Sequence, residues 1–276
     1  MTAQISVIEL KEALDTGHVR VVDGSWALDG TDMKALYLQD HIPSAQFFDL
    51  DAISDPASGL PHMAPAPEVF AKAIGGMGIG ENDRVVIYDR QGLFSAARVW
   101  WTFKLMGHKA VYVLKGGLPA WRAAGYATEA GQPTAAPVAY SATPRPEMVV
   151  DLTEMKRIIT GGSHSVLDAR PEARFAGLAA EPRAGLRSGH MPGSHNLPSG
   201  ELIANGALKP SEDLRRILAS FDLKPETNIV TTCGSGVTAA IIALALHETG
   251  YTNVRLYDGS WAQWGQDALD TPVVGV

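Results

Sequence analysis

Length, composition and charge narrow what this chain can be. Its 276 residues are enough for two domains, and a content of 46% hydrophobic and 19% charged residues is typical of a chain that buries a core. The formal net charge of −7 argues against a general nucleic-acid surface, which needs basic stripes to neutralise phosphates.

The predicted elements form two similar series along the chain. In the first half, a strand at 19–23 precedes the segment His41-Ile-Pro43, a strand at 84–89 and a helix at 95–106. In the second half, a strand at 165–168 precedes His190-Met-Pro192, a helix at 211–218 capped by Ser211, a strand at 228–233 and a helix at 239–248. Strands that alternate with helices predict parallel sheets with crossover helices.

Equivalent positions of the two series are separated by a nearly constant distance. The offsets are 145 for Asp23 and Asp168, 149 for His41 and His190, 144 for Asp89 and Cys233, and 143 for Trp121 and Trp264. Such a narrow spread indicates a duplicated domain. Between the copies, residues 127–147 are rich in proline, which favours extended chain. The sequence therefore predicts an N-terminal α/β domain at 1–126, a linker at 127–147 and a C-terminal α/β domain at 148–276.

Cysteine occurs once in the chain, at Cys233. A single thiol excludes an internal disulfide, a multi-cysteine metal centre and an internal redox partner. The first ten residues lack the basic and then apolar regions of a signal peptide, and the longest apolar run, 239–246, is too short to span a bilayer. We therefore expect a cytoplasmic protein that does not associate with membranes.

Cys233 stands where a predicted strand passes into a helix through a glycine-containing loop. Gly234 and Gly236 allow the backbone to curl with its amides pointing inward, and the next helix adds the positive end of its dipole. Such a cradle stabilises a thiolate over a thiol, so the loop predicts a nucleophile, whereas a lone cysteine in another context is more often a small buried hydrophobe. The duplicate has Asp89 at the position of the thiol, which predicts a non-catalytic N-terminal half.

The loop Cys233-Gly-Ser-Gly-Val-Thr-Ala239 resembles the active-site loop of the 3-mercaptopyruvate sulfurtransferases, two-domain members of the rhodanese group. The resemblance extends over Asp23-Gly-Ser-Trp26, His41-Ile-Pro43, Phe47-Phe-Asp49, Pro61-His-Met63, Arg98-Val-Trp-Trp101, Gly116-Gly-Leu118, Asp168-Ala-Arg170, Arg174-Phe175, Glu181-Pro-Arg183, Gly189-His190 and Tyr257-Asp-Gly-Ser-Trp261. It implies two tandem rhodanese-like domains. It also implies an enzyme that moves the sulfur of 3-mercaptopyruvate through a Cys233 persulfide and releases pyruvate.

The resemblance assigns roles to further residues. Arg174 and Arg183 match the substrate-binding arginines of the family, and an arginine is suited to grip a carboxylate with two hydrogen bonds. Spacing alone does not separate these two from Arg170 and Arg187. The amides that would stabilise the negative charge of the departing enolate are those of Gly234, Ser235, Gly236, Val237 and Thr238.

A serine, histidine and aspartate relay of the family falls on Ser235, His62 and Asp51. Ser235 would polarise the substrate carbonyl or pass on a proton, His62 would orient Ser235, and Asp51 would fix the tautomer of His62. The relay requires a loop of the first half to reach the active site of the second half. A histidine in a proline-bounded loop is otherwise more often a surface or interdomain contact.

Three alternatives compete with this prediction. A thiosulfate sulfurtransferase typically carries basic residues directly after its cysteine, where this chain has Gly234 and Ser235. A dual-specificity phosphatase needs an arginine six residues after the cysteine, where this chain has Ala239. A non-catalytic sulfur carrier or scaffold is the third, and the presence of Cys233 together with Arg174 and Arg183 argues against it.

The prediction needs no metal or organic cofactor. His41 and His190 occupy equivalent His-x-Pro turns without the spacing of metal ligands, so we interpret them as structural. Because there is no second cysteine, the persulfide needs an external acceptor. Thioredoxin, another thiol or cyanide would serve, and the sequence does not choose among them.

Overall fold

The computed structural model describes residues 2–275, which divide into two compact units. The first unit contains the chain up to Asp55 together with Ala64–Arg145 and Ile203–Leu208. The second unit contains Pro56–Met63, Pro146–Leu202 and the chain from Lys209 onward. Each half of the sequence therefore contributes one short segment to the unit that the other half builds.

The first unit is a parallel sheet with helices. Its elements are β1 (Gln4–Ile5), α1 (Val7–Asp15), β2 (Arg20–Asp23), α2 (Met33–Gln39), β3 (Gln46–Phe47), α3 (Pro67–Gly76), β4 (Val85–Tyr88), α4 (Ala96–Leu105), β5 (Val111–Leu114) and α5 (Gly117–Ala123). A two-residue turn at Asn205 and Gly206 joins β9 (Ile203–Ala204) to β10 (Ala207–Leu208), which pair antiparallel in this unit.

The second unit repeats this architecture. Its elements are η1 (Pro56–Ser58), η2 (Pro146–Met148), β6 (Val149–Val150), α6 (Leu152–Gly161), β7 (Ser165–Asp168), α7 (Glu172–Phe175), β8 (His195–Asn196), η3 (Ser199–Leu202), α8 (Ser211–Ala219), β11 (Ile229–Thr232), α9 (Ala239–Thr249), β12 (Val254–Tyr257), α10 (Ser260–Trp264) and η4 (Asp267–Leu269).

The two sheets have the same topology. Their strand orders are β1-β5-β4-β2-β3 and β6-β12-β11-β7-β8, and all neighbouring strands are parallel. Asp23 pairs with Tyr88 in the first sheet, and Asp168 pairs with Thr232 in the second. The next residues, Asp89 and Cys233, therefore occupy equivalent places at the carboxyl ends of central strands. The predicted duplication of an α/β domain is confirmed.

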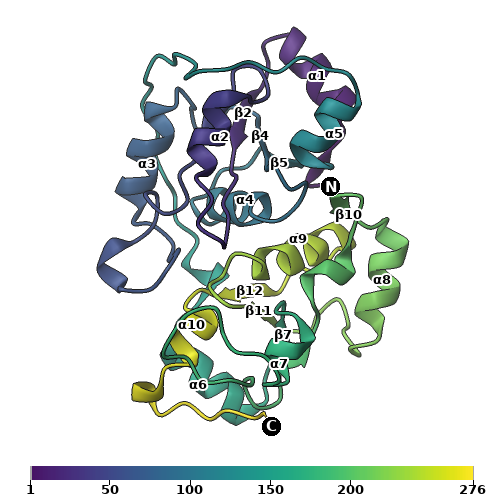
Figure 1. The fold of residues 1–276 in the computed structure, drawn as a ribbon. Helices are drawn as coiled ribbons and strands as arrows, with labels where there is room; N and C mark the ends of the chain where they lie inside the picture. Colours follow the sequence, from purple (N-terminus) through teal and green to yellow (C-terminus); the bar gives the residue numbers. More distant parts are fainter. Residues whose placement is uncertain (1, 276) are drawn as a thin grey trace. The chain divides into compact units, whose positions relative to one another are not determined.

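Each sheet has helices on both faces. On one face of the first sheet, α1 and α5 pack through Leu10 and Trp121 against strand residues such as Val86. On the corresponding face of the second sheet, α6 and α10 pack through Met155 and Trp264. The central helices α4 and α9 contact the strands of their own sheets, and both are buried along most of their length (Figure 1). Burial on both faces explains why every residue of the central strands β4 and β11 is buried.

The start of α8 and the stretch predicted as a linker differ from the sequence prediction. Ser211 does not cap α8, because it is already the first helical residue and Pro210, with its extended backbone, holds the cap position without a side-chain bond. The stretch predicted as a linker runs without helix or strand as far as Arg145, but it packs on the first unit. Its backbone bonds include Val138 N to Gly75 O, 2.9 Å, and Thr143 N to Met106 O, 3.0 Å.

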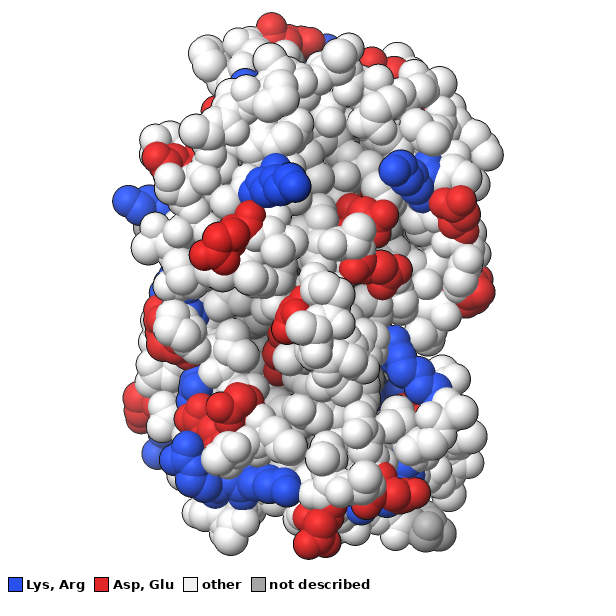
Figure 2. Space-filling view, turned by 90° about the vertical axis from the view of Figure 1, so that its left-hand side faces the viewer, with Lys and Arg blue, Asp and Glu red and all other residues white. Residues whose placement is uncertain are grey.

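Basic and acidic side chains are interspersed on the face that Figure 2 shows. No broad stripe of Lys and Arg crosses that face, in keeping with the formal net charge of −7. Among residues 2–275, no helix is both long and apolar enough to cross a membrane.

The end of α4 provides a test of pH dependence. His108 is buried between the Asp83 carbonyl, 2.8 Å from Nε2, and the Tyr140 hydroxyl, 3.1 Å from Nδ1. A neutral ring satisfies both contacts, since Nε2–H donates to the carbonyl and Nδ1 accepts from the hydroxyl. Burial lowers the pKa of His108, and the hydrogen bond to Asp83 only partly offsets it.

Acid should therefore weaken this part of the first unit. As the pH falls below about 6.5, the unfolded chain binds a proton at this histidine before the folded chain does, so the free energy of unfolding decreases. We expect His108→Gln to be about 1 kcal/mol less stable at neutral pH, because a buried hydrogen bond is lost. It should also lose less stability than the parent protein on acidification. Urea unfolding across this pH range measures both effects, and equal pH slopes would contradict the assignment.

Candidate active site

Cys233 is almost completely buried at the start of the loop between β11 and α9. The first turn of α10 holds this loop, because the Trp261 amide donates to the Cys233 carbonyl at 2.9 Å and the Ala262 amide donates to the Gly234 carbonyl at 2.8 Å. Gly236 adopts a left-handed conformation with φ of 78°. The loop therefore curls at the amino end of α9, as the two glycines predict.

In the first unit, the loop equivalent to the cysteine loop binds a carboxylate. The Asp89 carboxylate fills the equivalent loop and accepts hydrogen bonds from four backbone amides. The donors are the amides of Gln91 at 2.9 Å, Phe94 at 2.7 Å, Ser95 at 3.0 Å and Ala96 at 2.9 Å. The first turn of α5 holds this loop as α10 holds the cysteine loop, since the Leu118 amide donates to the Asp89 carbonyl at 3.0 Å. The loop of the first unit is thus an anion cradle that holds a carboxylate, and Cys233 occupies the equivalent position at the end of β11 in the second unit.

The β9–β10 hairpin covers the Asp89 loop in the first unit. A β-carbon on Gly92 would lie 2.6 Å from the Gly206 Cα atom, so these two backbones are in direct contact. The Asp89 loop is therefore filled by its own side chain and covered by a turn that the second half of the sequence supplies.

Ser235 contacts two predicted site residues. His62 Nδ1 lies 3.1 Å from Ser235 Oγ, and Arg183 Nη2 lies 3.5 Å from the same oxygen. All three belong to the second unit, because Pro56–Met63 is the segment that the first half contributes. His62 is buried with a left-handed φ of 59°, a conformation that only dense surroundings maintain in a residue other than glycine. The contact between Ser235 and His62 that the sequence requires is present.

Asp51, the third member of the predicted relay, belongs to the first unit. Its carboxylate accepts a hydrogen bond from the Trp26 indole at 3.2 Å, and both residues line a pocket of about 310 Å³ in that unit. The role of Asp51 toward His62 stays a prediction.

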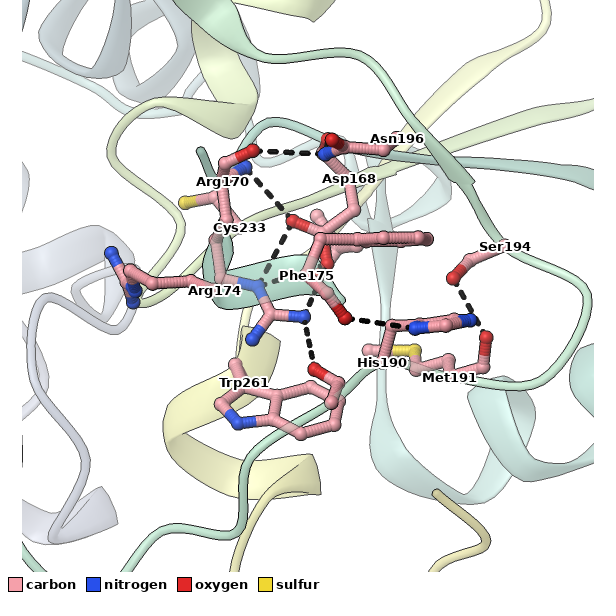
Figure 3. A network of polar contacts seen from close by, with 12 residues as sticks. Asp168, Arg170, Arg174, Phe175, His190, Met191, Ser194, Asn196, Cys233 and Trp261 are labelled. Atoms are coloured by element: carbon pink, nitrogen blue, oxygen red, sulfur yellow. Dashed lines mark hydrogen bonds and ion pairs between the residues drawn. The ribbon is translucent and has the colours of Figure 1, made fainter. Parts of the chain in front are cut away.

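Arg174 lies over the cysteine loop. Its Nη2 atom is 3.0 Å from the place that a β-carbon on Gly234 would occupy. Glu181 binds the edge of this guanidinium formed by Nε and Nη2, with Oε1 at 3.3 Å from Nε and Oε2 in contact with Nη2. In Figure 3 the Arg174 side chain and the Cys233 sulfur extend toward the same side of the network. A guanidinium group thus lies over position 234, where the loop itself has no basic side chain.

Arg170 is the buried centre of this network (Figure 3). Its guanidinium donates to Asp168 Oδ2 at 2.7 Å, to Glu181 Oε1 at 2.8 Å and to the Gly189 carbonyl at 2.9 Å, and it lies 4.1 Å from the centroid of the Trp261 ring. Burial by itself would lower the pKa of Arg170, but the charges and hydrogen bonds of Asp168 and Glu181 outweigh burial and raise it. The guanidinium stays charged and fixed.

Residues that the sequence argument left without a role complete the site. Ser260 Oγ lies 3.3 Å from the Cys233 amide, donates to the Tyr257 carbonyl at 2.9 Å and has a left-handed φ of 48°. Its equivalent in the first unit is Gly117, with φ of 54°. Ser260, Trp261 and Glu181 stand inside the motifs Tyr257-Asp-Gly-Ser-Trp261 and Glu181-Pro-Arg183, and those motifs were the available signal. A serine that keeps a glycine conformation indicates that its hydroxyl is needed.

His41 and His190 have equivalent structural contacts. His41 Nδ1 lies 2.9 Å from the Tyr37 carbonyl and the ring stacks on Tyr37, while His190 Nδ1 lies 2.8 Å from the Phe175 carbonyl and the ring stacks on Phe175. Each ring is thus held by a backbone carbonyl and a stacked aromatic ring of its own unit. Within the described range 2–275, no group of three or more His, Cys, Asp and Glu side chains is arranged to hold a metal ion.

Comparison with known proteins decides the family. The model of the rhodanese-like domain matches residues 6–124 and 151–267. The 3-mercaptopyruvate sulfurtransferase of Escherichia coli K12 is 39% identical over 96% of this chain and 95% of its own length. The chain belongs to the 3-mercaptopyruvate sulfurtransferase family. The resemblance and the tandem rhodanese fold inferred from the sequence are both confirmed.

Other members of the family are similar along their length. Thiosulfate/3-mercaptopyruvate sulfurtransferase 2 of Arabidopsis thaliana is 41% identical over 98% of this chain and 86% of its own length. A crystal structure of a 3-mercaptopyruvate sulfotransferase from E. coli superimposes with a TM-score of 0.86 at 37% identity, covering 95% of this chain and 99% of that chain. The family resemblance therefore covers both units.

Proposed function

We propose that this member of the family transfers sulfur from 3-mercaptopyruvate to an external acceptor through a persulfide on Cys233. The observation that carries the proposal is the buried position of the chain's one thiol in the loop before α9, with Arg174 over the loop and Ser235 in contact with His62 and Arg183. Cys233 precedes the amino end of α9, and the thiolate is the form of cysteine that attacks a sulfur donor.

The first half-reaction breaks the carbon–sulfur bond of the donor. The Cys233 thiolate attacks the sulfur of 3-mercaptopyruvate, a sulfur–sulfur bond forms, and the electron pair of the carbon–sulfur bond passes to carbon as the pyruvate enolate. Protonation of the enolate gives pyruvate. In the second half-reaction an acceptor thiolate or cyanide attacks the outer sulfur and returns the Cys233 thiolate. Two half-reactions through a covalent intermediate predict ping-pong kinetics.

The side chains around the thiol suit this donor. Arg174 and Arg183 offer guanidinium groups for the carboxylate, and the amides of residues 234–238 would stabilise the charge that develops on the departing enolate. Arg183 donates to Ser235 Oγ, so the Ser235 proton is directed toward His62 Nδ1 when that atom carries the lone pair. Ser235 and His62 are then placed to exchange a proton with the substrate carbonyl, and Asp51 would act as the third member of the relay.

Within the chain, we propose that the two copies have unequal roles. The C-terminal domain, 148–276, is catalytic, the linker covers 127–147, and the N-terminal domain, 1–126, supplies His62 and Asp51. The acceptor is thioredoxin, another thiol or cyanide, and the location is cytoplasmic. Support for the unequal roles comes from the Asp89 carboxylate that fills the anion cradle of the first unit.

A donor comparison tests the proposed function. Sulfur transfer to cyanide is measured with 3-mercaptopyruvate and with thiosulfate, and we expect the higher specificity constant for 3-mercaptopyruvate. Mass spectrometry after donor addition should show a gain of about one sulfur atom, about 32 Da, on Cys233. A higher constant for thiosulfate would instead favour the second candidate, a thiosulfate sulfurtransferase. The relative from A. thaliana supports this candidate, because its name includes both thiosulfate and 3-mercaptopyruvate. No adduct with either donor would exclude sulfur transfer through Cys233.

The strained serine of the site provides a separate prediction. Ser260→Gly should relieve a left-handed conformation that costs roughly 1 kcal/mol, whereas Ser260→Ala keeps the β-carbon and that cost. Both lose the hydroxyl beside the Cys233 amide, so we expect kcat to fall severalfold in each variant. Urea unfolding should find the glycine variant more stable than the alanine variant. Equal stability, or full activity in both variants, would contradict this role of Ser260.

A further inference from the structure

Glu181 holds the Nε–Nη2 edge of the Arg174 guanidinium, and the Nη1–Nη2 edge lies near the cysteine loop. Of its five N–H donors, Nε–H and one hydrogen of Nη2 are directed to Glu181. The hydrogens of Nη1 and the second hydrogen of Nη2 remain for a ligand, and these two nitrogens lie 3.9 Å and 3.0 Å from the place of a β-carbon on Gly234. The free edge therefore offers a pair of donors with carboxylate spacing beside Cys233.

Glu181 itself has no freedom to move. Its side chain is 2% exposed, and its Oε1 atom also accepts from Arg170 Nη1 at 2.8 Å. Arg170 in turn is fixed by Asp168 and by the Trp261 ring. A buried charged pair of this kind holds one geometry because any other arrangement would leave an unpaired charge out of water. Glu181, itself fixed by Arg170, therefore sets the orientation of the Arg174 guanidinium.

The same contacts balance charge. Asp168, Arg170, Glu181 and Arg174 carry formal charges that sum to zero, with side-chain exposures of 1%, 1%, 2% and 17%. Because Glu181 offsets the charge of Arg174, a ligand at the free edge meets two well-placed donors but little surplus positive charge. A monocarboxylate needs these donors, whereas a dianion such as thiosulfate gains more from uncompensated positive charge.

We infer that Glu181 is a positioning residue that acts through Arg174 and sets the preference for a carboxylate-bearing sulfur donor over a dianionic one. The inference rests on the proposed function and deepens it. Glu181 does not touch the reacting atoms. It holds the guanidinium that binds the donor and withholds the extra charge that would favour thiosulfate.

The test is Glu181→Gln, assayed with both donors. We expect KM for 3-mercaptopyruvate to rise about tenfold, equivalent to about 1.4 kcal/mol of binding, with kcat within about twofold. The kcat/KM for thiosulfate should stay constant or rise, so the ratio of the two specificity constants should change at least about tenfold in favour of thiosulfate. Glu181→Asp keeps the charge and should restore part of the ratio. An equal fall for both donors, or no change for either, would overturn the inference.

Controls separate this effect from a general loss of structure. Glu154→Gln breaks the ion pair with Arg255 in the same unit, outside the Cys233 site, and should leave the donor ratio unchanged. In an Arg174→Gln background, Glu181→Gln should no longer alter the ratio, because the two residues act as one unit. The double variant also removes one charge of each sign, which keeps the network neutral if the single variant folds poorly. A full effect of Glu181→Gln in that background would refute action through Arg174.

Persulfide formation in the parent protein separates a failure of the proposed function from a failure of the inference about Glu181. If it forms no persulfide with 3-mercaptopyruvate, the proposed function fails before any variant is considered. If it does, and Glu181→Gln leaves the donor ratio unchanged, only the inference about Glu181 fails.

Discussion

Cys233→Ser is expected to abolish sulfur transfer, with a loss of at least about a thousandfold in kcat/KM. A serine hydroxyl in the same cradle has a far higher pKa than a thiol, and its oxygen does not form a persulfide. Pyruvate release and thiocyanate formation should both fall to background, and the added mass of about 32 Da should disappear. Residual transfer above background would show that another group accepts the sulfur.

A matched control exists in the other copy of the domain. Asp89 occupies the position equivalent to Cys233, and its carboxylate binds four amides in the first unit. Asp89→Asn should retain sulfur transfer but lose about 1–3 kcal/mol of stability, because the NH₂ group of asparagine does not accept the amide bonds. Loss of activity in Cys233→Ser together with retention in Asp89→Asn would assign the chemistry to the second copy. Comparable losses of activity in both would argue against the division of roles.

The duplicated fold could be predicted from the sequence because it depends on local patterns. Short apolar strands, glycine-containing turns and helical stretches recur at a nearly constant offset. All four residues of the strand before Cys233 are buried, because both faces of the sheet are covered. The predicted helices at 95–106 and 239–248 agree closely with α4 and α9. Local signals were less reliable at boundaries, as Ser211 shows. The backbone of Pro210 decides where α8 begins, and a suitable capping side chain one residue later has no effect.

The exchange of segments between the units was harder to predict. Residues 56–63 and 203–208 contain only two- and three-residue elements, and their positions depend on contacts with residues far away in the sequence. His62 and Ser235 are separated by 173 positions, and only the family motif Pro61-His-Met63 pointed to their contact. Only the motif Glu181-Pro-Arg183 drew attention to Glu181, and it did not indicate a role, because an acidic residue beside arginines is more often a solvent-exposed partner. Its burial between two guanidiniums is a property of the folded chain.

Arg170→Ala is expected to be the most destabilising of the substitutions considered. Removal of the guanidinium leaves the carboxylates of Asp168 and Glu181 buried without their main partner, and breaking such a pair costs about 3–5 kcal/mol. Arg170→Lys should recover little, because an ammonium group does not reproduce the planar fork that contacts both carboxylates and stacks on the Trp261 ring. Denaturant unfolding measures the loss, and hydrogen exchange should localise it to the second unit.

Arg216→Ala provides the control for the charge itself. The pair of Arg216 with Asp213 on α8 is exposed, so its loss should cost at most about 1 kcal/mol. If the two arginine variants had equal stability, the buried network would not support the second unit. If Arg170→Ala is strongly destabilised while Glu181→Gln is mainly altered in donor preference, the network has two separable functions. Arg170 then holds the loops of the second unit together, and Glu181 uses that rigidity to aim Arg174 at the donor.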